Sequence, residues 1–138
     1  MVFCTENRER TIPLENTESL YKYIWGIVKN TNTKLYRING TEDHIHMLTD
    51  LHPSVSLATF MQKVKTASSA WMKQTSDFPQ FRGWAEGYAA LTYSWKDKDP
   101  VIEYIKNQRQ HHKTTNFMDE YRALLTEHGV EVDERYFP

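Results

Sequence analysis

Two histidines separated by one aliphatic residue, His44-Ile45-His46, form the pattern in this chain that first suggests chemistry. Side chains alternate between the faces of a strand, so on a strand both imidazoles point the same way while Ile45 and Met47 point into a core. Each neutral imidazole offers a nitrogen lone pair, and two adjacent rings can share one metal ion. Alone, such a pair is more often solvated surface, so a metal site needs further residues.

Tyr104 and Gln108 supply those further residues. They are four apart in a segment with helical periodicity, which places them on one helix face, one turn apart. An amide oxygen is a neutral, hard ligand for a divalent cation. A phenol, with a usual pKa of about 10, is a weak nucleophile that attacks more readily when a metal polarises the phosphate. His44, His46 and Gln108 therefore could hold a metal beside Tyr104, although alone Tyr104 is better explained as a buried aromatic.

Local patterns predict the elements that carry these residues. Asn39-Gly40 is a strong hairpin-turn signal between two strands, Gly87 suggests a bulge in a later strand, and Asp99-Pro100 resembles a helix start. The predicted order is strand, helix, strand, strand, helix, strand, helix, helix, over residues 2–5, 16–29, 34–38, 43–48, 54–74, 84–95, 99–111 and 116–129. This order predicts an α+β fold of ferredoxin-like topology, an antiparallel sheet with helices packed on one face and additional C-terminal helices.

Composition limits the possible functions. The chain has 138 residues, enough for one domain, which we expect to span residues 1–138. No apolar run is long enough to span a membrane, and the single cysteine, Cys4, excludes an internal disulfide framework and suits a cytoplasmic protein. Four tryptophans and eight tyrosines are many for this size, and they serve either packing or base stacking.

Charge is distributed unevenly along the chain, although the formal net charge is −1. Residues 60–115 carry nine Lys or Arg against five Asp or Glu, which is compatible with a nucleic-acid face. Lys63, Lys65 and Lys73 lie off the apolar stripe of the helix predicted over 54–74. We predict that these three lysines bind DNA phosphates, the alternative being a merely solvated helix face.

Several short motifs in a fixed order resemble one family. They are Asn39-Gly40, Asp43 to Leu48, Lys65 to Ser69 with Trp71, Trp84 to Tyr88, Tyr104 to Gln108, His111 to Lys113, and the closing pattern from Glu120 to Tyr136. Together they resemble the small insertion-sequence transposases of the HUH, single-tyrosine type (TnpA-like), which move DNA as single strands. The resemblance covers nearly the whole chain.

The resemblance implies a role for each residue. His44 and His46 match the HUH pair, Gln108 matches the third metal ligand, and Tyr104 matches the tyrosine that becomes linked to a 5′-phosphate. It also implies Mg²⁺ or Mn²⁺ as cofactor, recognition of single-stranded DNA hairpins at element ends, and a homodimer. A free 3′-hydroxyl then reverses the phosphotyrosine bond, so no external energy source is needed.

One departure from the family leaves alternatives open. The family usually has several more residues in its first strand before the equivalent of Val2 to Thr5, so we expect a first strand that is shortened at the N-terminus. A shortened strand would loosen the sheet that carries the histidines. The alternatives are therefore a decayed, non-catalytic protein that still binds DNA hairpins, and a replication initiator or relaxase with the same chemistry, although those chains are typically longer.

Overall fold

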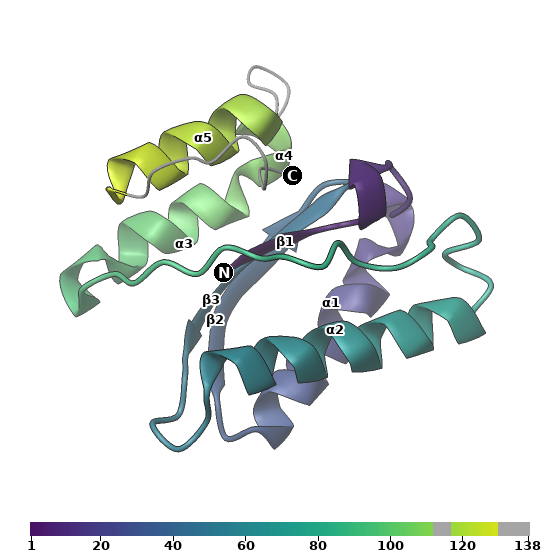
Figure 1. Ribbon diagram of the computed structural model, residues 1–138, viewed down its shortest axis with the longest axis horizontal. Helices are drawn as coiled ribbons and strands as arrows, with labels where there is room; N and C mark the ends of the chain where they lie inside the picture. Colours follow the sequence, from purple (N-terminus) through teal and green to yellow (C-terminus); the bar gives the residue numbers. More distant parts are fainter. Residues whose placement is uncertain (112–116, 130–138) are drawn as a thin grey trace.

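A three-stranded antiparallel sheet lies between two layers of helices (Figure 1). The structure, a computed structural model, describes residues 1–111 and 117–129. The sheet order is β1-β3-β2. The strands and helices are β1 (Val2–Cys4), α1 (Thr17–Asn30), β2 (Lys34–Gly40), β3 (His44–Asp50), α2 (Leu57–Gln74), α3 (Lys98–Lys106), α4 (Gln108–His111) and α5 (Phe117–Glu127). The short 3₁₀ turns are η1 (Glu6–Arg8), η2 (Leu14–Asn16) and η3 (Trp95–Asp97). The predicted α+β class with added C-terminal helices is confirmed.

The two faces of β3 have different partners, as the alternation of its side chains predicted. Ile45 and Met47 point into the main core, where they join Phe3 and the apolar stripes of α1 and α2. Residues of the opposite sheet face, Val2 and Cys4, pack against Leu124 and Leu125 of α5. The histidines of β3 therefore lie beneath the C-terminal helices rather than in the main core. Within the described ranges, no helix is both long and apolar enough to cross a membrane.

The predicted turn at Asn39-Gly40 is wrong, because both residues belong to β2. Asn39 pairs with His46 and Gly40 pairs with Ile45, so the connection is made by residues 41–43. The Asn39 side chain donates to the carbonyl oxygens of Ile105 and Lys106, at 3.1 and 2.9 Å. Asn39 thus docks the end of α3 onto the sheet instead of helping to reverse the chain.

Gly40 is required by a close backbone approach within the same hairpin. A Cβ atom at this position would lie 2.1 Å from the carbonyl oxygen of His44. Because a backbone atom cannot move aside cheaply, we expect Gly40→Ala to destabilise the protein by about 2 kcal/mol or more in urea unfolding. Gly26→Ala is the matched control, since nothing lies within 4 Å of its Cβ and alanine favours a helix. Equal unfolding midpoints for wild type and Gly40→Ala would contradict this account.

The strand predicted over residues 84–95 is wrong, although the segment does run beside β1 (Figure 1). Among the described residues, only two isolated bridges form, Val2 to Ala89 and Thr5 to Trp84. The three steps from Val2 to Thr5 thus oppose five steps from Trp84 to Ala89, so the second segment bulges around Gly87, where a bulge was predicted. A three-residue β1 offers too few partners for a regular ladder, and the fourth edge position of the expected ferredoxin-like sheet remains irregular.

One predicted helix start differs from the structure, and another is confirmed. The helix predicted from Asp99 begins at Lys98, after Asp97, and it is interrupted at Asn107 between α3 and α4. The helix predicted from Ser54 or Ser56 begins after Ser56, whose hydroxyl accepts a hydrogen bond from the Thr59 amide at 3.1 Å. The predicted cap at residue 116 lies outside the described residues, while α5 is followed by Gly129 in a left-handed conformation, as predicted.

Candidate active site

His44 and His46 lie side by side on the face of β3 that the C-terminal helices cover. Their ring centroids are 5.1 Å apart and the rings are nearly perpendicular, at 77°. Antiparallel pairing fixes them, since His44 faces Cys4 and His46 faces Val2 across the ladder. Both side chains are buried, which is unusual for histidine and excludes the solvated-surface explanation of the pair.

The connection before β3 holds the His44 ring. Nδ1 of His44 lies 2.6 Å from Oδ1 of Asp43 and 2.9 Å from the Thr41 hydroxyl, which itself donates to Asp43 at 3.0 Å. A carboxylate acceptor places the proton on Nδ1 and leaves the lone pair on Nε2. This carboxylate–histidine arrangement is the one that typically orients a metal-binding imidazole.

Glu120 completes the group from α5, and sequence reasoning did not place it in the site. Its carboxylate is buried, with Oε1 3.3 Å from Nε2 of His46. One potential ligand atom from each of His44, His46 and Glu120 lies within 4.8 Å of the others. Glu120 is four residues before Leu124, which packs against the sheet, so both lie on the same face of α5. An acidic residue on that apolar face is the feature of the sequence that could have identified Glu120 as a site residue.

His46 is in the form that binds metals. The pKa of His46 is lowered to about 4, chiefly by burial; the hydrogen bond with Glu120 opposes this shift and the neighbouring His44 adds to it. The imidazole is therefore neutral near pH 7, with a nitrogen lone pair to donate. A cluster of two imidazoles and one carboxylate suits a divalent cation by donor type.

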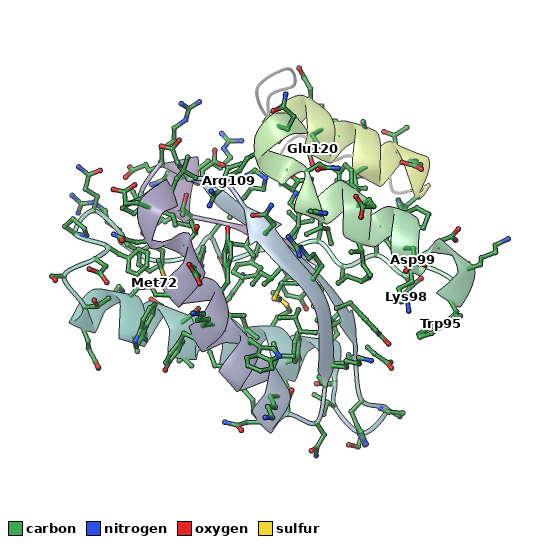
Figure 2. All side chains as sticks on the ribbon, turned by 180° about the vertical axis from the view of Figure 1, so that it is seen from behind. Met72, Trp95, Lys98, Asp99, Arg109 and Glu120 are labelled. Carbon is green, nitrogen blue, oxygen red and sulfur yellow. The ribbon has the colours of Figure 1, made fainter. Side chains whose placement is uncertain are left out.

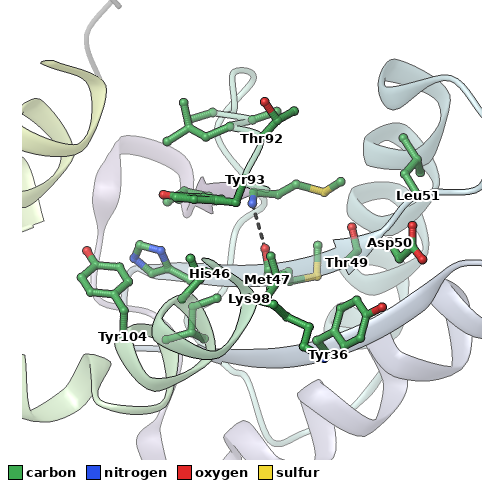
Figure 3. Close-up of a pocket in the computed structure, with 18 of the residues that line it drawn as sticks. Tyr36, His46, Met47, Thr49, Asp50, Leu51, Thr92, Tyr93, Lys98 and Tyr104 are labelled. Atoms are coloured by element: carbon green, nitrogen blue, oxygen red, sulfur yellow. Dashed lines mark hydrogen bonds between the residues drawn. The ribbon is translucent and has the colours of Figure 1, made fainter. Parts of the chain in front are cut away.

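Tyr104 lies directly beside this cluster. Its ring is perpendicular to that of His46 with centroids 5.8 Å apart, and its hydroxyl donates to Oε1 of Glu120. Burial raises the pKa of Tyr104, and the hydrogen bond and negative charge of Glu120 raise it further. Figure 3 shows the phenol and the His46 imidazole next to each other at one end of a pocket. The hydroxyl thus has a proton acceptor already in contact.

Gln108 follows one turn after Tyr104 and is fully buried. Its amide nitrogen donates to the carbonyl oxygen of Tyr104 at 3.3 Å, and its side chain also hydrogen-bonds the phenol, which lowers the pKa of Tyr104. The two residues therefore act together across the interruption at Asn107. Asn39 anchors this end of α3 to the strand next to β3, which brings the Tyr104 turn to the histidines.

The three predicted DNA-binding lysines have different surroundings. Lys63 and Lys73 are exposed on α2. The ammonium of Lys65 instead donates to three carbonyl oxygens of the bulged segment, those of Ala85, Glu86 and Gly87, at 2.8 to 3.0 Å. Lys65 thus holds that segment against the helix. The side chain of His111 and all of His112, noted in the sequence, lie outside the described residues.

Comparisons with known proteins identify the family of this chain. The family model described as "Transposase IS200 like" matches residues 1–108. The transposases for insertion sequence element IS200 from Salmonella typhimurium and Salmonella typhi are each 26% identical over 118 residues, covering 82% of this chain and 77% of theirs. A crystal structure from Deinococcus radiodurans R1, of a protein provisionally described as a transposase, has a TM-score of 0.60 at 23% identity. It covers 78% of this chain and 86% of its own. The chain therefore belongs to the IS200-like transposase family.

Proposed function

We propose that this transposase cuts and rejoins single-stranded DNA through a covalent bond between Tyr104 and a 5′-phosphate. The observation that carries the proposal is the Tyr104 hydroxyl, which contacts Glu120 beside two buried histidines. An isolated buried tyrosine would need no such neighbours. Family membership supports transposition, and the arrangement of side chains supports the tyrosine mechanism.

His44 and His46 would hold Mg²⁺ or Mn²⁺ with Gln108 as third ligand, and we add Glu120 as a further oxygen donor. Both imidazoles are buried, Asp43 orients His44, and the ligand atoms of Glu120 and the histidines lie within 4.8 Å of one another. When bound, the cation would polarise the scissile phosphate and stabilise the leaving 3′-oxygen.

The chain's own residues perform the proton and bond exchange. The Tyr104 oxygen attacks phosphorus, a P–O bond to the tyrosine forms, and the bond to the 3′-oxygen breaks. The phenol proton passes to the Glu120 carboxylate that already accepts its hydrogen bond, and the departing oxygen takes up a proton from solvent to become a 3′-hydroxyl. Attack by another 3′-hydroxyl reverses these events and joins the strands.

The partners we propose are single-stranded DNA hairpins and a second copy of the chain. Both follow from the family resemblance carried by the histidine, tyrosine and glutamine motifs. The exposed Lys63 and Lys73 on α2 offer two cationic groups for hairpin phosphates. They lie on the helix layer opposite the histidines, so they would contact DNA away from the scissile phosphate (Figure 1).

A covalent-adduct gel tests the proposed function. The protein is mixed with labelled single-stranded oligonucleotides that carry candidate element ends, with Mn²⁺ or with EDTA. We expect a band that survives denaturant, forms only with Mn²⁺, and is absent when the oligonucleotide is annealed to its complement. A band that is equally strong in EDTA would contradict a metal-dependent tyrosine transfer.

Glu120→Gln is expected to weaken Mn²⁺ binding about tenfold and to slow adduct formation, since it keeps the shape of the side chain but removes the anionic donor and proton acceptor. Isothermal titration with Mn²⁺ measures the first effect and timed adduct gels the second. Glu103→Gln is the matched control, because it makes the same charge change on an exposed position of α3. Unchanged Mn²⁺ affinity in Glu120→Gln would leave Gln108 as the third ligand without Glu120.

A further inference from the structure

A cavity leads away from Tyr104 and His46 along residues 46–50 of β3. Its volume is about 520 Å³, and it runs between β3 and the extended segment of residues 89–95 (Figure 3). Tyr104 and His46 line one end of it. Tyr93 lies over His46, whereas Tyr36 lies farther along, and Trp95 and Lys98 also line the cavity. The proposed mechanism uses only the first end.

The far end of the cavity carries an exposed tryptophan beside Tyr36. Trp95 is 70% exposed, which is a high value for such a large side chain. Trp95 lies edge-on to Tyr36 with centroids 6.1 Å apart. The local turn η3 and the strand β2 therefore present two aromatic rings at the mouth of a cavity that ends at the proposed nucleophile.

Two lysines accompany these rings. The ammonium of Lys98 lies 4.1 Å from the Trp95 centroid and 5.3 Å from that of Tyr36, while that of Lys34 lies 4.9 Å from Tyr36. Figure 2 shows Trp95 and Lys98 close together at the surface, where α3 begins. Within residues 1–111 and 117–129, neither lysine has a carboxylate within ion-pair distance. Their charge is thus available to an anion, although Asp50 also lines the cavity.

We propose that Trp95, Tyr36, Lys34 and Lys98 form a subsite for unpaired nucleotides that adjoin the scissile phosphate. Bases would stack on the rings, and the two ammonium groups would approach the sugar–phosphate backbone, a combination typical of single-strand binding. This inference rests on the proposed function, because the DNA strand in the subsite must continue from the phosphate that Tyr104 attacks. Continuity of the cavity with Tyr104, together with the two lysines, favours a nucleic acid strand over an apolar partner.

Binding of a short oligothymidylate tests the subsite without any chemistry. Fluorescence anisotropy is measured in EDTA on Tyr104→Phe protein, so that neither metal nor covalent capture contributes. We expect an additional Trp95→Ala change to weaken binding about tenfold, the scale of one lost stacking contact, and Trp95→Phe to restore most of it. Trp25→Ala is the matched control, since Trp25 is 52% exposed on α1 with Lys29 over its ring. It should bind like the parent protein.

The outcomes separate this inference from the proposed function. Trp95-dependent binding without any wild-type adduct would sustain the subsite and refute the tyrosine mechanism. If adduct formation and oligothymidylate affinity are both unchanged in Trp95→Ala, the tyrosine mechanism would stand and the subsite would be refuted. An oligonucleotide with abasic residues should bind wild type and Trp95→Ala equally. If Trp95→Ala instead splits a dimer in sedimentation and leaves DNA affinity unchanged, the surface joins two copies and the proposal is wrong.

Discussion

Tyr104→Phe is expected to abolish the covalent protein–DNA adduct and to leave DNA binding intact. The substitution removes the one oxygen that forms the bond to phosphorus but keeps the ring that packs edge-on against His46. We expect the rate of adduct formation to fall by at least about 10³-fold, as is usual when a nucleophile is deleted. The adduct gel measures this loss, and anisotropy with a labelled hairpin measures the retained binding.

Tyr93→Phe is the matched control for this experiment. Tyr93 lines the same cavity as Tyr104 and loses the same hydroxyl, but its ring packs edge-on against that of His128, with centroids 4.9 Å apart. Its adduct should form as in wild type. If instead the adduct persists in Tyr104→Phe and disappears in Tyr93→Phe, Tyr93 is the nucleophile and the assignment of Tyr104 is wrong.

The parts of the site that depend only on the side-chain periodicity of a single strand or helix were predictable from the sequence. Alternation along β3 placed His44 and His46 on one face because a strand has only two faces. Four-residue spacing placed Tyr104 and Gln108 together, and the interruption at Asn107 did not separate them, since the Gln108 amide still reaches the Tyr104 carbonyl. In both cases neighbours in sequence determine the geometry.

The parts that were wrong depend on partners far away in sequence. Asn39-Gly40 has turn chemistry, but Asn39 instead satisfies carbonyl groups at the end of α3 and Gly40 permits a close backbone approach. Likewise, the alternation from Trp84 to Trp95 is typical of a strand, but within the described part of the chain only Val2 and Thr5 form bridges to it. At both places, contacts with residues distant in sequence outweighed the local conformational preference.

Glu120 shows why the metal cluster could not be assembled from the sequence alone. It reaches the site because α5 packs its leucines on Val2 and Cys4, which places the preceding turn over His46. No pattern within the sequence of α5 indicates that this helix packs on Val2 and Cys4. Only the fold identified Glu120 as a buried carboxylate whose partners are His46 and Tyr104.

His46→Ala is expected to abolish both Mn²⁺ binding and cleavage. Loss of an imidazole ligand removes one donor and leaves Glu120 without its partner at 3.3 Å. Because losing groups that only orient a ligand already costs about 10- to 100-fold in metal affinity, we expect a loss of about 100-fold or more, measured by titration with Mn²⁺. His52→Ala is the control, since His52 is an exposed histidine just beyond β3.

Thermal unfolding gives a second readout of His46→Ala that does not depend on activity. A cation that binds only the folded protein stabilises wild type by about 2.7 kcal/mol at one hundred times its dissociation constant. Wild type and His52→Ala should therefore gain in melting temperature when Mn²⁺ is added, and His46→Ala should not. A variant with no activity that still gains stability from Mn²⁺ would place the cation elsewhere. Loss of both effects would tie the chemistry to the buried pair on β3.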